Sequence, residues 1–351
     1  MTNTTEWITR SVSRLRSGAS STDKAPKASK PVADKPLADK QVADGAATKV
    51  PAPRSTHERL QATLRRGNES LSPRALRRLL ADLQDVVAPQ VSELEGGRRA
   101  QVVAGWYGQA EPEERRDMWL LLCEQFAPDA TRFQSARQRY EAAAGTADEG
   151  QAEISLRRAL VSPRTRLMQR FAVFPEGMRF LVDLRAELLP QLKSDKRLVA
   201  LDADLEHLFT TWFDVAFLEL RRLSWDSPAS LIEKLIKYEA VHDIRSWADL
   251  KNRLDSDRRC YGFFHPRLPN EPLIFVEVAL VDRISSSITP LLDEAAAPAD
   301  LKKATTAIFY SISNTQPGLR GVSFGDSLIK HVVETLTAEF PRLRTFATLS
   351  P

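Results

Sequence analysis

The segment 320–326 carries the residue types best suited to chemistry in this chain. It reads Arg-Gly-Val-Ser-Phe-Gly-Asp, follows an apolar run at 307–312 that is typical of a buried strand, and precedes a predicted helix. The apolar face of that helix is formed by Phe324, Leu328, Ile329, Val332, Val333 and Leu336. At such a junction, free N–H groups and the helix dipole favour a phosphate, and Arg320 could add a charge-assisted contact. Glycine pairs also occur in ordinary loops, so spacing alone leaves both interpretations open.

Single polar side chains are the other candidates for chemistry. Ser350 follows the last apolar run, 345–349, where a serine is usually a turn residue; a catalytic serine needs a base within hydrogen-bond reach. The histidines fall singly, and His265 is the only one near the predicted phosphate turn. We expect Glu277 to face solvent, residues 310–313 to be plain strand residues, and the tryptophans to lie in the core: Trp212, Trp225 and Trp247.

Bulk composition narrows the class of protein. At 351 residues, with 42% apolar and 27% charged residues, the chain is long enough for two domains and has an ordinary soluble composition. Residues 1–56 hold ten Lys/Arg and five Asp/Glu, so the charge of this tail is +5. Since the whole chain has a net charge of +4, the remaining residues together carry −1. A nucleic-acid partner is therefore not indicated. No apolar run approaches the about 18–20 residues of a membrane span, and Cys123 and Cys260 fit neither a disulfide framework nor a zinc site.

The chain divides into three parts by composition and periodicity. Residues 1–56 contain three consecutive five-residue repeats at 30–44 and are expected to be a disordered basic tail; a short amphipathic targeting helix is the alternative for its first part. Residues 57–213 predict an all-α helical bundle, with Ser72 and Pro73 opening one helix. Its apolar stripes fall at 76–87, 118–126, 154–161, 171–188 and 198–209.

Residues 214–351 predict a second domain, which makes the fold class α+β. Helices are expected at 215–223, 227–239 and 246–255. Strands are expected at 259–264, 273–281, 307–312 and 345–349, with a turn at Pro269-Asn270 before the second of them.

Several strings in this second domain carry a resemblance to a known family. They are W-D-S-P-A-S at 225–230, Y-E-A-V-H at 238–242, R-R-C at 258–260, E-P-L-I-F-V-E-V-A-L at 271–280, A-I-F-Y-S-I-S at 307–313, G-L-R-G-V at 318–322 and L-S-P at 349–351. Together they are specific, and residues 212–351 resemble malonyl-CoA decarboxylase. The helical segment before them is compatible with the resemblance, and the tail lies outside it.

The resemblance implies a helical domain used in oligomer assembly, followed by a catalytic domain of the N-acetyltransferase (GNAT) fold. That fold holds the coenzyme A pyrophosphate on backbone amides between a strand and a helix. By resemblance, the residues that contact malonyl-CoA are Arg320, Gly321, Val322, Ser323, Phe324, Gly325 and Asp326. Backbone contacts transfer more safely than side-chain roles, since some members carry an acidic residue where this chain has Ser323.

The family's catalytic serine, in its L-S-P motif, falls on Ser350. Its expected partner is a histidine well downstream, and none of the histidines present takes its place: His57, His207, His242, His265 and His331. We therefore expect the sequence to be a fragment or a truncated form, with an incomplete GNAT-like domain and little activity by itself.

The activity implied by the resemblance is that of a carboxy-lyase, which converts malonyl-CoA to acetyl-CoA and CO2 without a metal or a prosthetic group. An acyl-CoA-dependent acyltransferase and a non-catalytic scaffold that binds coenzyme A are the alternatives. The expected partners are malonyl-CoA, acetyl-CoA and further copies of the chain, joined through the helical domain. We expect a cytoplasmic protein, or an organellar one if the basic N-terminus is a targeting peptide.

Overall fold

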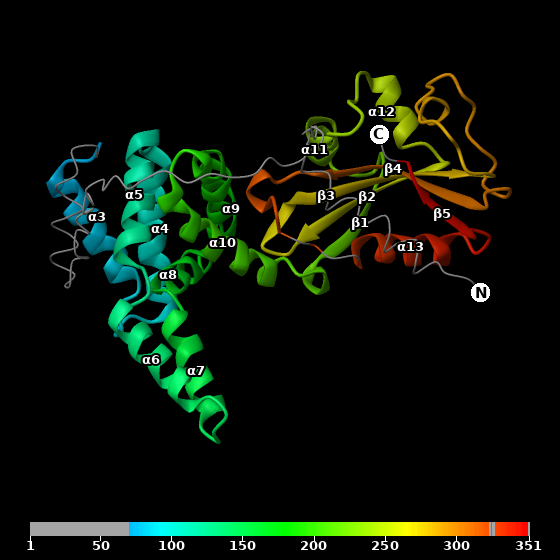
Figure 1. Ribbon diagram of the computed structural model, residues 1–351. Helices are drawn as coiled ribbons and strands as arrows, with labels where there is room; N and C mark the ends of the chain where they lie inside the picture. Colours follow the sequence, from blue (N-terminus) through cyan, green and yellow to red (C-terminus); the bar gives the residue numbers. More distant parts are fainter. Residues whose placement is uncertain (1–69, 323, 325–326, 350–351) are drawn as a thin grey trace, which may run out of the picture. The chain divides into compact units, whose positions relative to one another are not determined.

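The computed structural model describes residues 70–322, 324 and 327–349 (Figure 1). The predictions for the tail 1–56, both disorder and a targeting helix, lie outside the described residues, as does His57. Four candidate site residues also lie outside them: Ser323, Gly325, Asp326 and Ser350.

The described residues up to 213 are helical, as predicted. The helices are α3 (Pro73–Val86), α4 (Glu93–Gln109), α5 (Pro112–Gln125), α6 (Ala130–Ala143), α7 (Glu149–Leu160), α8 (Pro163–Phe171), α9 (Gly177–Leu188) and α10 (Val199–Trp212). Short 3₁₀ turns at Leu189–Lys193 and Lys196–Leu198 join α9 to α10. No helix within the described ranges is both long and apolar enough to cross a membrane.

The start of α3 is set by the residues that the sequence analysis identified. The Ser72 side chain accepts a hydrogen bond from the Ala75 N–H at 3.2 Å, and Pro73 takes the first helical position. Four residues of the predicted apolar stripe are buried on this helix, Leu76, Leu79, Leu80 and Leu83. The fifth, Val87, is the half-buried C-cap, and Val86 is buried in its place. A side-chain cap and an apolar stripe were therefore enough to place this element correctly.

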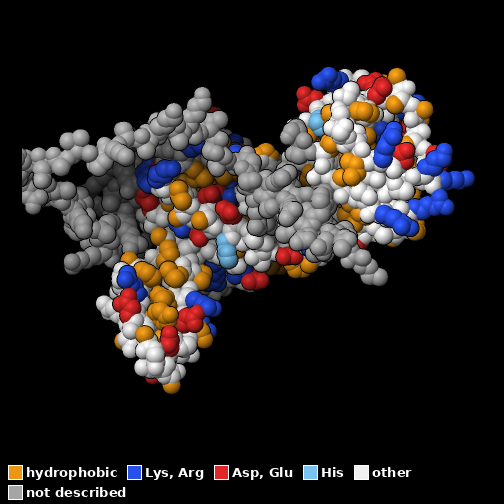
Figure 2. Space-filling model, turned by 45° about the vertical axis from the view of Figure 1, so that its right-hand side comes forward, with side chains coloured by type: hydrophobic (Ala, Val, Ile, Leu, Met, Phe, Trp, Pro, Cys, Tyr) orange, Lys and Arg blue, Asp and Glu red, His pale blue; other side chains and the backbone are white. Residues whose placement is uncertain are grey.

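The prediction of a buried stripe at 154–161 is wrong. α7 forms there, but Ile154, Leu160 and Val161 are 43%, 51% and 62% exposed. The reason is that α6 and α7 pair with each other as a hairpin that extends away from the other helices (Figure 1), so that only small residues such as Ala136 and Ala159 are enclosed. Hydrophobic side chains consequently gather on the surface of this hairpin (Figure 2).

The second part of the described chain contains a five-stranded sheet in the order β1-β2-β3-β4-β5. The strands are β1 (Glu219–Leu223), β2 (Arg258–His265), β3 (Leu268–Val281), β4 (Thr306–Asn314) and β5 (Thr345–Thr348). Neighbours pair antiparallel from β1 to β4, whereas β4 and β5 are parallel. Helices α11 (Ala229–Tyr238) and α12 (Trp247–Arg253) cover one face of the sheet and α13 (Ser327–Glu339) covers the other (Figure 1).

Two predictions for this part are wrong. The expected helix at 215–223 is a single 3₁₀ turn, Val215–Phe217, followed by β1. This short segment is amphipathic in either conformation, and its pairing with β2 decides in favour of the strand. The expected turn at Pro269-Asn270 lies inside β3, because the β2–β3 hairpin reverses at residues 266–267 and is irregular around Phe264.

Candidate functional site

The segment predicted to bind phosphate does connect a strand to a helix, β4 to α13. After β4 the chain forms a 3₁₀ turn at Pro317–Leu319, and Val322 then closes a further turn by donating its N–H to the Leu319 carbonyl at 3.0 Å. Val322 is buried, Phe324 is half-buried, and α13 begins at Ser327. Five residues of the predicted helix face are buried on α13: Leu328, Ile329, Val332, Val333 and Leu336. The sixth, Phe324, was wrongly assigned to the helix, because it precedes the first helical residue.

Gly321 is the residue of this segment whose backbone requires glycine. Its φ of +85° lies in the left-handed region, where a Cβ is disfavoured by about 1–2 kcal/mol. Gly321 is exposed, and its N–H donates to no acceptor among the described residues. A backbone N–H of an exposed residue that has no acceptor among the described residues is available to an anionic group.

β5 brings the chain end toward the middle of β4. The two strands pair from Thr306 with Thr345 to Phe309 with Thr348, and the Leu349 N–H donates to the Phe309 carbonyl at 2.9 Å. Ser350 follows directly in the sequence and lies outside the described residues, so its predicted role is a proposal considered below.

A buried polar cluster that the sequence analysis missed lies between β4 and the α11–α12 connection. Ser311 and Ser313 donate their hydroxyls to the Glu239 carboxylate, at 2.7 Å and 3.0 Å. Glu239 also accepts the N–H groups of Val241 and His242, both at 2.9 Å. Alternate residues of one strand, Ser311 and Ser313, thus reach one carboxylate, and they are more than plain strand residues.

The prediction that Glu277 faces solvent is wrong, since it is completely buried. Its Oε2 accepts a hydrogen bond from Arg253 Nη1 at 2.9 Å, and Arg253 Nε donates to Asp249 at 2.7 Å. Burial penalises the charged carboxylate more than Arg253 stabilises it, which raises the pKa of Glu277 to about 8. Glu277 also pairs in register with Ser311, at a bulge that leaves Tyr310 as an extra residue in β4.

The tryptophan prediction is wrong for two of the three residues. Trp225 and Trp247 are 48% and 70% exposed, and their ring centroids lie 6.5 Å apart, so they contact each other outside the core. Trp212 is half-buried beside Phe209.

The histidines take no part in a recognisable catalytic or metal arrangement within the described residues. His265 is buried against Phe213, its Nδ1 accepts the Arg267 N–H at 3.1 Å, and burial lowers its pKa. His331 is exposed on α13. No cluster of three or more His, Cys, Asp or Glu side chains suited to a metal ion occurs among the residues that the structure describes.

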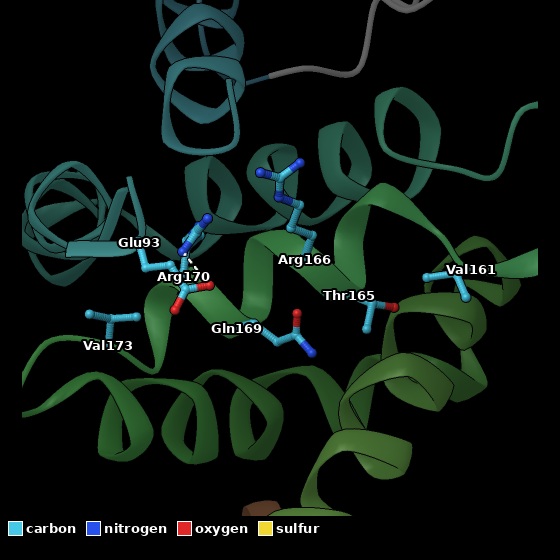
Figure 3. Close-up of a pocket in the computed structure, with 7 residues that line it drawn as sticks. All are labelled: Glu93, Val161, Thr165, Arg166, Gln169, Arg170 and Val173. Carbon is cyan, nitrogen blue, oxygen red and sulfur yellow. Dashed lines mark ion pairs between the residues drawn. The ribbon is translucent and has the colours of Figure 1, made fainter. Parts of the chain in front are cut away.

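A cavity of about 560 Å³ in the helical region was not predicted from the sequence (Figure 3). It is lined by Glu93, Val161, Thr165, Arg166, Gln169, Arg170 and Val173. The buried Arg170 forms an ion pair with Glu93 at 3.1 Å, drawn as a dashed line in Figure 3, and its Nε packs against Gly96 of α4. Because the buried guanidinium of Arg170 is already paired with Glu93, this cavity is a weaker candidate for a ligand-binding site than the β4–α13 segment.

The described residues form a helical region followed by a mixed α/β region with a five-stranded sheet, whose strand β4 is connected to α13 through the segment 320–326. Two family models match the chain: the malonyl-CoA decarboxylase N-terminal domain over residues 126–213 and the malonyl-CoA decarboxylase C-terminal domain over residues 216–351. The chain belongs to the malonyl-CoA decarboxylase family.

Individual relatives agree with this assignment. Malonyl-CoA decarboxylase, mitochondrial, of Mus musculus is 37% identical over 265 residues, which cover 73% of this chain and 54% of that protein. The crystal structures of malonyl-CoA decarboxylase from Rhodopseudomonas palustris and Agrobacterium vitis are 42% and 40% identical, with TM-scores of 0.70 and 0.72. Those matches cover 79% and 78% of this chain and 66% of each crystallised chain. The chain spans about half the length of the curated relatives it matches.

Proposed function

We propose that this chain contributes to the decarboxylation of malonyl-CoA to acetyl-CoA and CO2. The observation that supports this most is the match to both family models, one of which spans the whole β4–α13 segment and the L-S-P motif.

Coenzyme A is proposed to lie with its pyrophosphate against the backbone of 320–326, the segment made of Arg320, Gly321, Val322, Ser323, Phe324, Gly325 and Asp326. Two features of the described part of this segment favour the assignment. Gly321 presents an exposed N–H without an acceptor among the described residues, and the exposed Arg320 can pair with a phosphate oxygen. The segment's backbone is expected to matter more than its side chains, because N–H groups bind any pyrophosphate alike.

The chemistry breaks the bond between the terminal carboxylate and the methylene carbon of the malonyl group. The electron pair moves into the thioester, which becomes an enolate, and CO2 leaves. Hydrogen-bond donors directed at the enolate oxygen would lower the barrier, and a proton must then reach the methylene carbon. We propose that Ser350 orients the malonyl carboxylate and takes part in this proton transfer, since Leu349 is bound to β4 and Ser350 follows it.

The assay is incubation with malonyl-CoA while CO2 and acetyl-CoA are followed. In the natural full-length protein, CO2 release that falls strongly in Ser350→Ala supports the proposal, and release that is unchanged by this substitution removes Ser350 from the mechanism. Acyl transfer to an amine without CO2 release would favour the acyltransferase alternative, and coenzyme A binding without either reaction would favour a scaffold. The expectation that this chain alone turns over little substrate stays a prediction of the same assay.

Oligomer formation through the helical region and the compartment also remain proposals. Size measurement in solution by light scattering tests the first: a mass of two or more chains supports the proposal, and a mass of one chain contradicts it. The mouse and rat relatives are named as mitochondrial proteins, which supports the organellar alternative over a cytoplasmic location. Fractionation of cells that express the natural protein distinguishes the two.

A further inference from the structure

Arg185 of α9 is a charged residue whose burial the proposed function has not explained. Its side chain is 2% exposed, and it forms ion pairs with Asp202 at 2.8 Å and with Glu206 at 3.4 Å, both on α10. A buried guanidinium is costly unless all its donors find partners. Here one of them, Nη1, reaches out of the helical region to the carbonyls of Gly318 and Arg320, at 2.9 Å and 2.8 Å.

The Arg320 carbonyl belongs to the segment 320–326 proposed to bind coenzyme A, and the Gly318 carbonyl lies two residues before it. In a trans peptide the C=O and the following N–H point in opposite directions, and no described peptide bond is cis. The Arg320 carbonyl faces Arg185, so the N–H of Gly321 faces away from α9. That N–H is the exposed donor without an acceptor among the described residues. Arg185 thus fixes the direction in which this donor points.

Further contacts hold the residues just before this segment, 316–319, against α9. A Cβ added to Gly318 would lie 1.9 Å from the Val182 carbonyl oxygen, so the backbone of Gly318 is in direct contact with the helix. One turn earlier, Arg179 Nη1 donates to the Gln316 side chain at 2.6 Å. Residues 316–320 therefore contact α9 at Arg179, Val182 and Arg185, and Arg185 provides the contact nearest to Gly321.

We propose that Arg185 is a positioning residue for coenzyme A: by binding the Gly318 and Arg320 carbonyls, it turns the Gly321 N–H toward the pyrophosphate. The inference rests on the proposed function, because it takes the Gly321 N–H as a contact of the coenzyme A pyrophosphate. It gives the helical region an indirect part in ligand binding, through the backbone of residues 318–321, in addition to any part in assembly. Lysine could not substitute fully, since one ammonium group cannot reproduce the planar fork that reaches α10 and both carbonyls.

The test compares Arg185→Lys and Arg185→Met with a matched control, Arg164→Met. Arg164 is also buried, at 4% exposure, and binds a carboxylate, Asp204, at 2.8 Å and one backbone carbonyl at 3.1 Å, but it does not contact the β4–α13 segment. The measurements are the dissociation constant for coenzyme A by calorimetry, the melting temperature, and amide hydrogen exchange of a peptide covering 316–322. A charge-balanced double variant, Arg185→Met with Asp202→Asn, replaces the single variant if that one fails to fold.

We expect both Arg185 variants to weaken coenzyme A binding by about tenfold or more, equivalent to about 1.4 kcal/mol, and to speed exchange at 316–322. Arg164→Met should lower the melting temperature about as much as Arg185→Met does, whereas its dissociation constant for coenzyme A should stay within about twofold of the wild-type value. Folded Arg185 variants that bind like the wild type, or an equal loss of binding in Arg164→Met, would overturn the proposal. Failure of the wild-type protein to bind coenzyme A would refute the proposed function instead, and the exchange data alone would then show whether Arg185 orders this segment.

Discussion

Gly318 offers the sharpest test of how the β4–α13 segment is attached to the helical region. In Gly318→Ala the new Cβ would lie 1.9 Å from the Val182 carbonyl oxygen and 2.8 Å from its carbon. Real Cβ atoms stay at least 3.0 Å from such neighbours, so the segment and α9 must separate by more than 1 Å. The obstacle is helix backbone and cannot rotate away.

The expected cost follows from the class of the change. Overpacking a tight contact costs about 1–3 kcal/mol, and the value should lie at the upper end or above because the contact is with backbone. The separation would also lengthen the Arg185 hydrogen bond to the Gly318 carbonyl, which is now 2.9 Å. We therefore expect a loss of about 3 kcal/mol in the free energy of unfolding, measured by denaturant titration.

Gly105→Ala is the matched control. Gly105 lies inside α4 with no atom within 4 Å of its added Cβ, so alanine should stabilise this helix by about 0.8–1 kcal/mol. The same substitution is thus expected to have opposite signs at the two positions. A Gly318→Ala protein as stable as the wild type would show that the segment does not rest on α9 as described.

Three further predictions concern the buried carboxylates of Glu277 and Glu239 and the turn at Gly321. Glu277→Gln should flatten the pH dependence of stability. In the wild type the pKa of Glu277 is about 8 in the folded state, against an ordinary value of 4.5, so between these pH values the folded state keeps a proton that the unfolded state loses. The free energy of unfolding of the wild type therefore falls as pH rises from about 4.5 to 8. The melting-temperature advantage of this variant should grow from pH 5 to pH 8, and parallel curves for variant and wild type would contradict the assignment. Ser311→Ala removes a donor to the buried Glu239 carboxylate and should cost about 1–3 kcal/mol in denaturant unfolding, whereas a neutral result would mean that water replaces the hydroxyl. Gly321→Ala and Gly145→Ala both place a Cβ at positive φ and should each cost about 1–2 kcal/mol, but only the former should weaken coenzyme A binding; equal binding losses would argue against the site.

The strand–turn–helix at the proposed site could be predicted because its signals are local. An apolar run, a glycine-containing turn and a helical stripe specify β4 and α13 without reference to the rest of the chain. The same holds for α3, where Ser72 and Pro73 fix the first turn. Elements with strong local signals were accordingly placed within a few residues of their observed bounds.

The errors arise where partners distant in sequence decide the structure. β1 is a strand because it pairs with β2, about 40 residues away, and nothing within residues 219–223 requires that. Glu277 looks like a solvent-facing strand residue until Arg253 is seen to pair with it. Arg185 could not be connected to Arg320 from the sequence, since 135 residues separate the two.

The central claim is that the backbone of 320–326 holds coenzyme A. The most direct measurement is amide hydrogen exchange along the whole chain, with and without saturating coenzyme A. The account requires that slowed exchange concentrate in peptides covering residues 318–329, with Gly321 among the protected amides. Protection confined to the helical region around Arg170, or none anywhere while calorimetry reports binding, would contradict it.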